Sequence, residues 1–139
     1  MSTVATRLDN GVMTLTLSRP EQGNAIDMSL ARDLLAAARS AEGDKSARCV
    51  VITGAGRMFC VGGDIGAFAA AGDEASAFIK ELADTLHEAV MVLAGMDKPV
   101  VALVNGPAAG AGFSLAMAAD IVLASERSEE RRVGKECRL

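Results

Sequence analysis

Two short apolar runs, each followed by a loop rich in glycine and alanine, constrain the fold of this chain more than any other feature. The runs are residues 48–53 and 100–104, and their loops are residues 54–66 and 105–112. Continuous apolar runs of this length are typical of strands buried on both faces of a parallel sheet. A third such run, residues 121–124, follows. The sequence therefore predicts an α/β fold with parallel strands and right-handed crossovers.

Helical and strand patterns fill the rest of residues 1–125. Asp27 stands where a helix N-cap is expected, and Pro99 stops a second, longer helix. The Asn10-Gly11 pair is a strong hairpin signal between two strands. The predicted order is strand 3–7, strand 12–18, helix 27–43, strand 48–53, helix 73–98, strand 100–104, helix 114–119 and strand 121–124.

Composition excludes several classes of function. The chain has 139 residues, half of them hydrophobic, with net charge -4, which suits one domain with one core. It has no Trp, no Tyr and no basic stripe, so we expect no nucleic-acid partner. No apolar run is long enough to cross a membrane, and no secretory signal is visible. Its three cysteines, Cys49, Cys60 and Cys137, have neither disulfide nor zinc spacing, so we expect a cytoplasmic protein without a metal.

Several small motifs come close to known ones. Residues 50–56 resemble the start of a dinucleotide fingerprint, but Phe59 stands where the third glycine is needed. Residues 112–116 are one residue short of a nucleophile elbow, and His87, the only histidine, is expected on a helix surface. Cys60 is interpreted as a small buried residue. Asp64 either caps a short helix or contacts a ligand, and the cap is the favoured interpretation.

The two glycine-rich loops allow two interpretations. Ligands of open α/β sheets bind beyond the carboxyl ends of the strands, and small residues let a ligand approach the backbone closely. Two such loops side by side could direct two backbone N–H groups at one oxygen, which is an oxyanion hole. Alternatively, the glycines serve only tight turns and packing. Spacing alone does not decide between them.

Four segments, in this order, resemble the enoyl-CoA hydratase/isomerase (crotonase) family. They are LSRPEQGNAI at residues 17–26, TGAGRMFCVGGDI at 53–65, KPVVALVNGPAAGAG at 98–112 and ADIVLA at 119–124. Each motif is weak by itself, whereas the ordered set is highly specific. The resemblance implies the crotonase-like (ClpP/crotonase) fold, a spiral of ββα units that is truncated in this chain. It also implies an acyl-CoA thioester substrate, with coenzyme A as part of that substrate and no separate cofactor, and a parent homotrimer or hexamer.

The resemblance further implies roles for particular residues. The backbone N–H groups of Gly63 and Ala111 match the oxyanion-hole donors that hold the thioester oxygen of an enolate. The positions that match the family's acyl-CoA contacts are Gly23, Ala25, Gly62, Asp64, Ile65 and Ala108.

The chain departs from the family pattern at two places. Ser114 stands where hydratases carry a glutamate, and a serine cannot act as the base that activates water. This favours an isomerase-like enzyme, with a parent enoyl-CoA hydratase, a non-catalytic acyl-CoA-binding fragment and a structural subunit as alternatives. Gln22 and Gly23 occupy positions that are often basic in the family, which weakens one phosphate contact.

Charge changes sharply at residues 126–139, where nine of fourteen residues are charged. This segment resembles the translation of a common short-read sequencing adapter, which predicts a non-native tail; the alternative is a genuine charged tail. We therefore expect residues 1–125 to be the N-terminal part of a crotonase-like domain, inactive alone. A half-domain leaves apolar surface uncovered and should be marginally stable or prone to aggregation. A cooperative unfolding transition of a monomer would contradict this.

Overall fold

The computed structural model describes residues 2–126. Apart from Glu126, the predicted non-native tail lies outside the described residues. No helix within residues 2–126 is long and apolar enough to cross a membrane.

A hairpin opens the fold, as the sequence predicted. Strands β1 (Val4–Asp9) and β2 (Val12–Leu17) pair in antiparallel register, with Asp9 opposite Val12. The turn residues Asn10 and Gly11 have φ angles of 52° and 84°. Two consecutive positive φ angles match the twist of the flanking strands, and asparagine and glycine adopt them at low cost.

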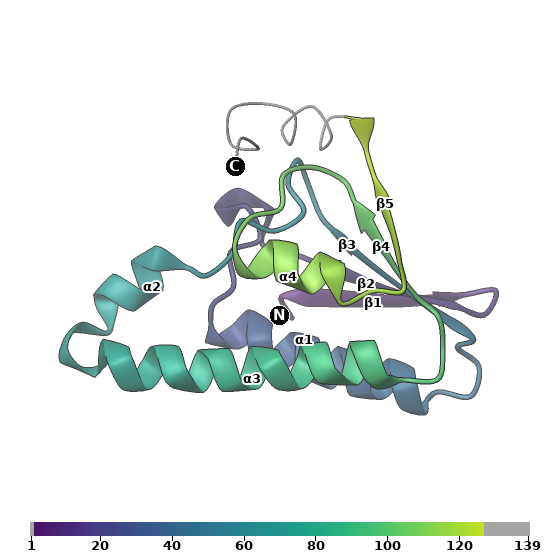
Figure 1. Cartoon of the computed structure of the whole chain (residues 1–139), viewed down its shortest axis with the longest axis horizontal. Helices are drawn as coiled ribbons and strands as arrows, with labels where there is room; N and C mark the ends of the chain where they lie inside the picture. Colours follow the sequence, from purple (N-terminus) through teal and green to yellow (C-terminus); the bar gives the residue numbers. More distant parts are fainter. Residues whose placement is uncertain (1, 127–139) are drawn as a thin grey trace.

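Five strands form one sheet in the order β1-β2-β3-β4-β5. Strands β3 (Cys49–Gly54), β4 (Val100–Val104) and β5 (Ile121–Ala124) each pair in parallel with the preceding strand, as predicted. Successive right-handed crossovers in one direction place their helices on the same face of a sheet. Figure 1 shows the two long helices, α1 (Met28–Gly43) and α3 (Ala75–Gly95), together on one side.

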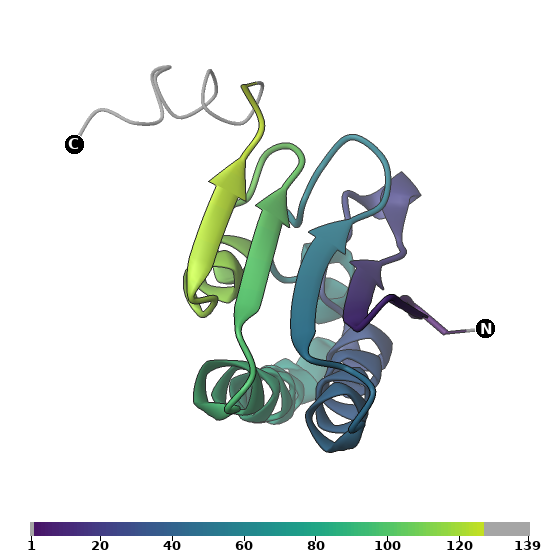
Figure 2. The ribbon, with the colours of Figure 1, turned by 90° about the vertical axis from the view of Figure 1, so that its right-hand side faces the viewer.

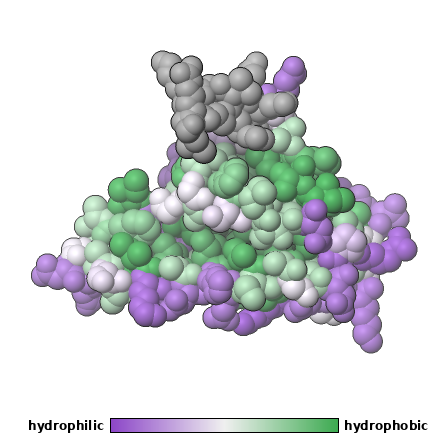
Figure 3. All heavy atoms as spheres, viewed as in Figure 1, coloured by the Kyte–Doolittle hydropathy of each residue, from purple (hydrophilic) through white to green (hydrophobic). Residues whose placement is uncertain are grey.

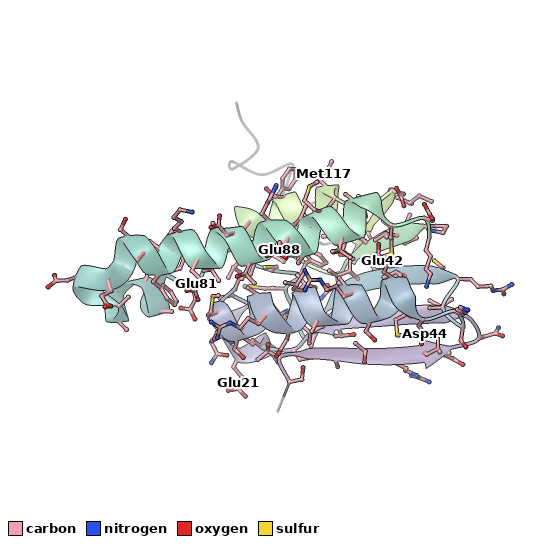
Figure 4. All side chains as sticks on the ribbon, turned by 90° about the horizontal axis from the view of Figure 1, so that it is seen from below. Glu21, Glu42, Asp44, Glu81, Glu88 and Met117 are labelled. Carbon is pink, nitrogen blue, oxygen red and sulfur yellow. The ribbon has the colours of Figure 1, made fainter. Side chains whose placement is uncertain are left out.

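Helices α1 and α3 lie side by side and run in the same direction. Arg32 pairs with Glu81 at 3.0 Å, and Arg39 pairs with Glu88 at 2.7 Å. The second pair lies seven residues after the first on both helices, which shows that the helices are parallel. Figure 4 shows Glu81 and Glu88 between α1 and α3. Exposed pairs of this kind add little stability. The apolar faces of the helices meet the sheet in a core that includes Leu15, Leu30, Leu34, Ile52, Val50, Ala89 and Leu93.

The short helical segments differ most from the prediction. Helix α2 (Ile65–Ala70) lies partly inside the predicted 54–66 loop, and α4 (Ala111–Met117) begins at residue 111 rather than 114. Two 3-10 turns, η1 (Pro20–Gln22) and η2 (Gly72–Glu74), precede α1 and α3. Segments of six or seven residues have too few apolar positions to show a helical period, so sequence patterns do not define their ends.

The prediction that β5 is buried is wrong for the described residues. Ile121 and Leu123 are 52% and 55% exposed, and Leu103 beside them on β4 is 39% exposed. Figure 2 looks onto this sheet face, where no described helix covers β3, β4 or β5. In Figure 3 hydrophobic residues gather around β4 and β5 and over α2, while hydrophilic residues line α3. The described helices cover one face of the sheet, and apolar side chains on the other face are exposed.

Candidate functional site

The two glycine-rich loops lie side by side at one edge of the sheet. They leave the carboxyl ends of β3 and β4, which are neighbouring parallel strands. Three backbone hydrogen bonds join them: Phe59 N–H and Cys60 N–H donate to the Pro107 carbonyl at 3.0 and 3.3 Å, and Ala109 N–H donates to the Cys60 carbonyl at 3.0 Å. The loops therefore form one continuous backbone surface at the position where open α/β sheets bind ligands.

Two glycines make this close approach possible. A Cβ atom on Gly106 would collide with the backbone oxygen of Arg57, and one on Gly112 would collide with the backbone oxygen of Cys60. The packing interpretation of these two glycines is therefore confirmed. Gly62 and Gly63 also take part in a backbone bridge with Ile26.

An isolated parallel bridge between Ile26 and Gly63 fixes the end of the first loop. Ile26 N–H donates to the Gly62 carbonyl at 2.7 Å, and Asp64 N–H donates to the Ile26 carbonyl at 3.0 Å. In a parallel bridge the N–H of the central residue points to the side away from its partner, so Gly63 N–H faces away from Ile26. Within residues 2–126 no hydrogen bond from Gly63 N–H is found.

The Ala111 N–H belongs to the first residue of α4 and, within residues 2–126, also makes no hydrogen bond. The first N–H groups of a helix have no partner within the helix. Gly110 precedes it with a φ angle of 54°, which glycine adopts without strain. A Cβ placed on Gly62 would lie 3.5 Å from Ala111 N. Since Gly62 is bonded to Gly63, the structure brings the two predicted donors, Gly63 and Ala111, into one small region.

Asp64 is a helix cap, which confirms the favoured interpretation. Its Oδ1 accepts the Ala67 N–H at 3.0 Å at the start of α2, and its Oδ2 accepts Arg19 Nη1 at 3.2 Å. The Ala67 N–H, and after it the Arg19 guanidinium, hold the pKa of the Asp64 carboxyl below its usual value. Both oxygens are engaged and the group is ionised at neutral pH, so its side chain is poorly suited to donate a proton.

The other predicted contact residues surround this region. Gly23 carbonyl accepts the Val61 N–H at 3.1 Å, so the segment with Gly23 and Ala25 lies against the first loop. Ala108, in the second loop, forms a bridge with Cys60 in the first. Ile65 directly follows Asp64 and is 77% exposed. Ser114 is exposed on α4, one turn after Ala111.

Two buried or half-buried asparagines hold the first loop, and neither was predicted from the sequence. Asn24 is fully buried, and its Nδ2 donates to the carbonyls of Ala55, Met58 and Phe59 at 2.9–3.1 Å. Asn105 Nδ2 donates to the carbonyls of Gly56 and Met58. The signal that could have found them was an asparagine beside glycines, since asparagine tolerates the positive φ of 57° found at position 24.

The remaining reactive side chains do not join the site. His87 is exposed on α3. Cys60 is fully buried with its Sγ 3.2 Å from the Asn24 carbonyl, and burial raises the pKa of its thiol. Within the described part of the chain, no three His, Cys, Asp or Glu side chains are grouped as metal ligands would be.

Comparison with known proteins identifies the family. A family model described as Enoyl-CoA hydratase/isomerase matches residues 7–134. The chain belongs to this family. A probable enoyl-CoA hydratase of Rhodobacter capsulatus is 40% identical over 124 residues, which cover 89% of this chain and 46% of the relative. A 1,2-epoxyphenylacetyl-CoA isomerase of Escherichia coli is 36% identical over 137 residues, which cover 93% of this chain and 50% of the relative.

Solved structures show the same fold. An enoyl-CoA hydratase from Polaromonas sp. JS666 superposes with a TM-score of 0.84 at 37% identity, covering 90% of this chain and 49% of that one. A Pseudomonas aeruginosa protein gives a TM-score of 0.86 at 36% identity, covering 91% of this chain and 54% of that one. The crotonase fold expected from the sequence is thus confirmed. The chain spans about half the length of the curated relatives it matches.

Proposed function

We propose that this chain supplies the oxyanion hole of an enzyme that acts on acyl-CoA thioesters. The observation that carries the proposal is the pair of N–H groups, Gly63 and Ala111, which two adjacent loops present without a partner among residues 2–126. Backbone donors fixed in this way stabilise negative charge that develops on an oxygen, and one such donor is typically worth about 3–4 kcal/mol in the transition state.

The proposed reaction removes a proton from the carbon next to the thioester carbonyl. The electron pair of the broken C–H bond moves onto the thioester oxygen, which becomes an enolate held by the two N–H groups. Asp64 does not act as the base in this proposal, since both of its oxygens are engaged. We assign the proton-moving carboxylate to the part of the parent protein that corresponds to the other half of the relatives.

Ser114 leads us to propose an isomerase-like rather than a hydratase reaction. A hydratase needs a carboxylate to activate water, and a serine hydroxyl at neutral pH is too weak a base. The relatives include proteins named as hydratases and one named as an isomerase, so their names leave both reactions open. The contacts with the acyl-CoA are proposed to come from Gly23, Ala25, Gly62, Asp64, Ile65 and Ala108.

The second candidate function is acyl-CoA binding without turnover. It is favoured by the lack of a suitable base among the site residues within 2–126: Ser114 is no carboxylate, and Asp64 is committed to Ala67 and Arg19. The two candidates share the oxyanion hole and differ only in proton transfer.

Exchange of the α-proton of an acyl-CoA in deuterated water by the full-length parent protein, which would carry the assigned carboxylate, distinguishes the candidates when followed by mass spectrometry. An enzyme incorporates deuterium, whereas a binding protein forms a complex and incorporates none.

The variant Ala111→Pro removes one donor at the first position of α4, where proline is tolerated. It should abolish exchange and weaken binding, while Ala111→Gly, which keeps the N–H, should not. Equal behaviour of the two variants would contradict the oxyanion hole.

The assembly and location of the parent protein are also proposals. We infer a cytoplasmic homotrimer or hexamer that binds coenzyme A only as part of its substrate, and that takes neither a metal nor a nucleic-acid or membrane partner. Analytical ultracentrifugation of the full-length protein tests the assembly. Resequencing the gene across residues 125–139 tests the tail, because a reading frame that continues into family-like sequence would show the tail to be non-native.

A further inference from the structure

Arg19 connects the segment after β2 to the segment that carries the Gly63 N–H. Its Nη1 donates to the Ala25 carbonyl at 2.6 Å and to Asp64 Oδ2 at 3.2 Å, 45 residues away in sequence. The Arg19 side chain is only 16% exposed. Salt screens a partly buried pair less than a surface pair, so salt weakens this contact less than the exposed pairs between α1 and α3.

The same guanidinium joins the N-caps of two helices. Asp64 caps α2 through Ala67, and Asp27 caps α1 by accepting the Leu30 N–H at 2.8 Å. The second oxygen of Asp27 lies 3.6 Å from Arg19 Nη2. One cation therefore sits beside two cap carboxylates, and it offsets the repulsion that they would otherwise exert on each other.

The peptide between these contacts is the one that presents the proposed donor. The Gly62–Gly63 peptide has no Cβ on either side, so rotation about its flanking bonds meets little steric resistance. Its orientation depends on the bridge with Ile26, which accepts from Asp64 and donates to Gly62. Arg19 hydrogen bonds to Ala25, the residue before Ile26, and to Asp64, the residue after Gly63. It therefore ties together the two backbone segments that form this bridge.

We propose that Arg19 is a positioning residue of the oxyanion hole. By clamping Ala25 and Asp64 it fixes the rotation of the Gly62–Gly63 peptide and hence the direction of the Gly63 N–H. The proposal rests on the function proposed above for that N–H. Arg19 acts through the peptide and does not itself touch the thioester.

The absorption spectrum of a bound aryl-acryloyl thioester of coenzyme A tests this role. Donors aimed at the thioester oxygen draw electron density along the conjugated chain and shift its absorption to longer wavelength. At saturating ligand, Arg19→Gln should keep less than about half of the red shift of the unaltered chain, because one of two donors is misdirected. Its dissociation constant should rise less than about tenfold. A merely structural role would reduce the amount of complex and not the shift of the complex that forms.

Two variants provide the controls. Arg19→Lys keeps the charge but has no planar fork for two acceptors, so it should recover only part of the shift. Arg32→Gln removes an exposed ion pair between α1 and α3, with Glu81, and should retain the full shift. A full red shift in Arg19→Gln overturns the proposal. If that variant does not fold, Asp64→Asn replaces it, because an asparagine keeps one oxygen for the cap and loses both the charge and the acceptor for Arg19.

A second measurement separates this proposal from the proposed function. If the unaltered chain shows no red shift with the thioester, the oxyanion hole is wrong. Hydrogen–deuterium exchange of the Ile26 and Asp64 amides without ligand then decides the role of Arg19. Both amides are hydrogen bonded in the bridge, and Arg19→Gln should accelerate their exchange at least about tenfold while Arg32→Gln does not. Unchanged exchange in Arg19→Gln overturns the positioning role.

Discussion

The two glycine-rich loops meet at the same edge of the sheet but are held by different kinds of contact. Side chains from outside it hold the loop after β3: Asn24, and Asn105 at the start of the other loop, donate to its carbonyls, and Arg19 holds its far end. Backbone contacts hold the loop after β4, which joins the first loop through three backbone hydrogen bonds and packs closely at Gly106 and Gly112.

This difference determines how each loop responds to substitution. Close backbone packing leaves no room for an added atom. A single glycine that gains a side chain should therefore be enough to disrupt the conformation of the loop after β4. Contacts from side chains can be lost one at a time, so the loop after β3 should respond in steps. Each loop presents one proposed donor, and the two donors should therefore be lost by different routes.

The largest expected effect comes from Gly106→Ala. Its new Cβ would collide with the backbone oxygen of Arg57, and backbone cannot move aside as a flexible side chain can. We expect the free energy of unfolding to fall by about 3 kcal/mol in urea denaturation. Gly95→Ala is the matched control, since a Cβ there meets nothing within 4 Å at the end of α3. It should be neutral or stabilising, and similar losses in both variants would refute the packing argument.

A smaller loss is expected for Asn24→Ala, which removes the contacts of Asn24 with the loop after β3. Three carbonyls would lose their donor in a fully buried position, and alanine is also strained at a φ of 57°. The expected cost is about 2–3 kcal/mol by thermal or urea unfolding. Asn105→Ala should cost about 1 kcal/mol, because water can replace the amide of this half-buried residue. An Asn105 variant as damaging as the Asn24 variant would contradict this ranking of the two asparagines.

Local patterns predicted the helices and strands well where they repeat over many residues. The α1 positions predicted to face the core, Leu30, Leu34, Ala37, Ala38 and Ala41, are all buried. The Asn10-Gly11 turn and the parallel order were also confirmed. The start of α4 was placed at residue 114 and not at 111 because one short turn has no repeat to measure. The exposure of β5 was missed because an apolar run does not tell whether a sheet face is covered.

The structure places the predicted site positions close together, but the side chains that hold them were not predicted from the sequence patterns. Gly63 and Ala111 were found by resemblance, and the structure brings them together. Arg19 reaches Asp64 across 45 residues, and Asn24 reaches carbonyls more than 30 residues away. Such contacts depend on which atoms the folded chain brings within about 3 Å, and no periodicity in the sequence encodes that distance.

The smallest expected effect is on the free energy of unfolding at acidic pH. Hydrogen bonding by the Ala67 N–H, and then Arg19, lowers the pKa of Asp64 below its usual value of 3.8 in the folded chain. The folded chain therefore binds this proton less readily than the unfolded chain. The resulting stabilisation is fully present above the usual value and is lost as the pH falls through the lowered one. Asp64→Asn should reduce the free energy of unfolding by about 1 kcal/mol at neutral pH, since the carboxylate is only partly buried.

The difference between Asp64→Asn and the unaltered chain should shrink as the pH falls below 3.8, because the carboxylate of the unaltered chain is then being neutralised. Asp33 is the control outside the loops: the N–H of Thr3 lowers its pKa in the same direction, and it holds the N-terminal strand to α1. Asp33→Asn should show the same dependence on pH, with additive losses in the double variant because the two sites share no partner. Only Asp64→Asn should also weaken the red shift of a bound thioester. An Asp33 variant with an equally weakened red shift would mean that the acid response reports general stability rather than the hold on the loop after β3.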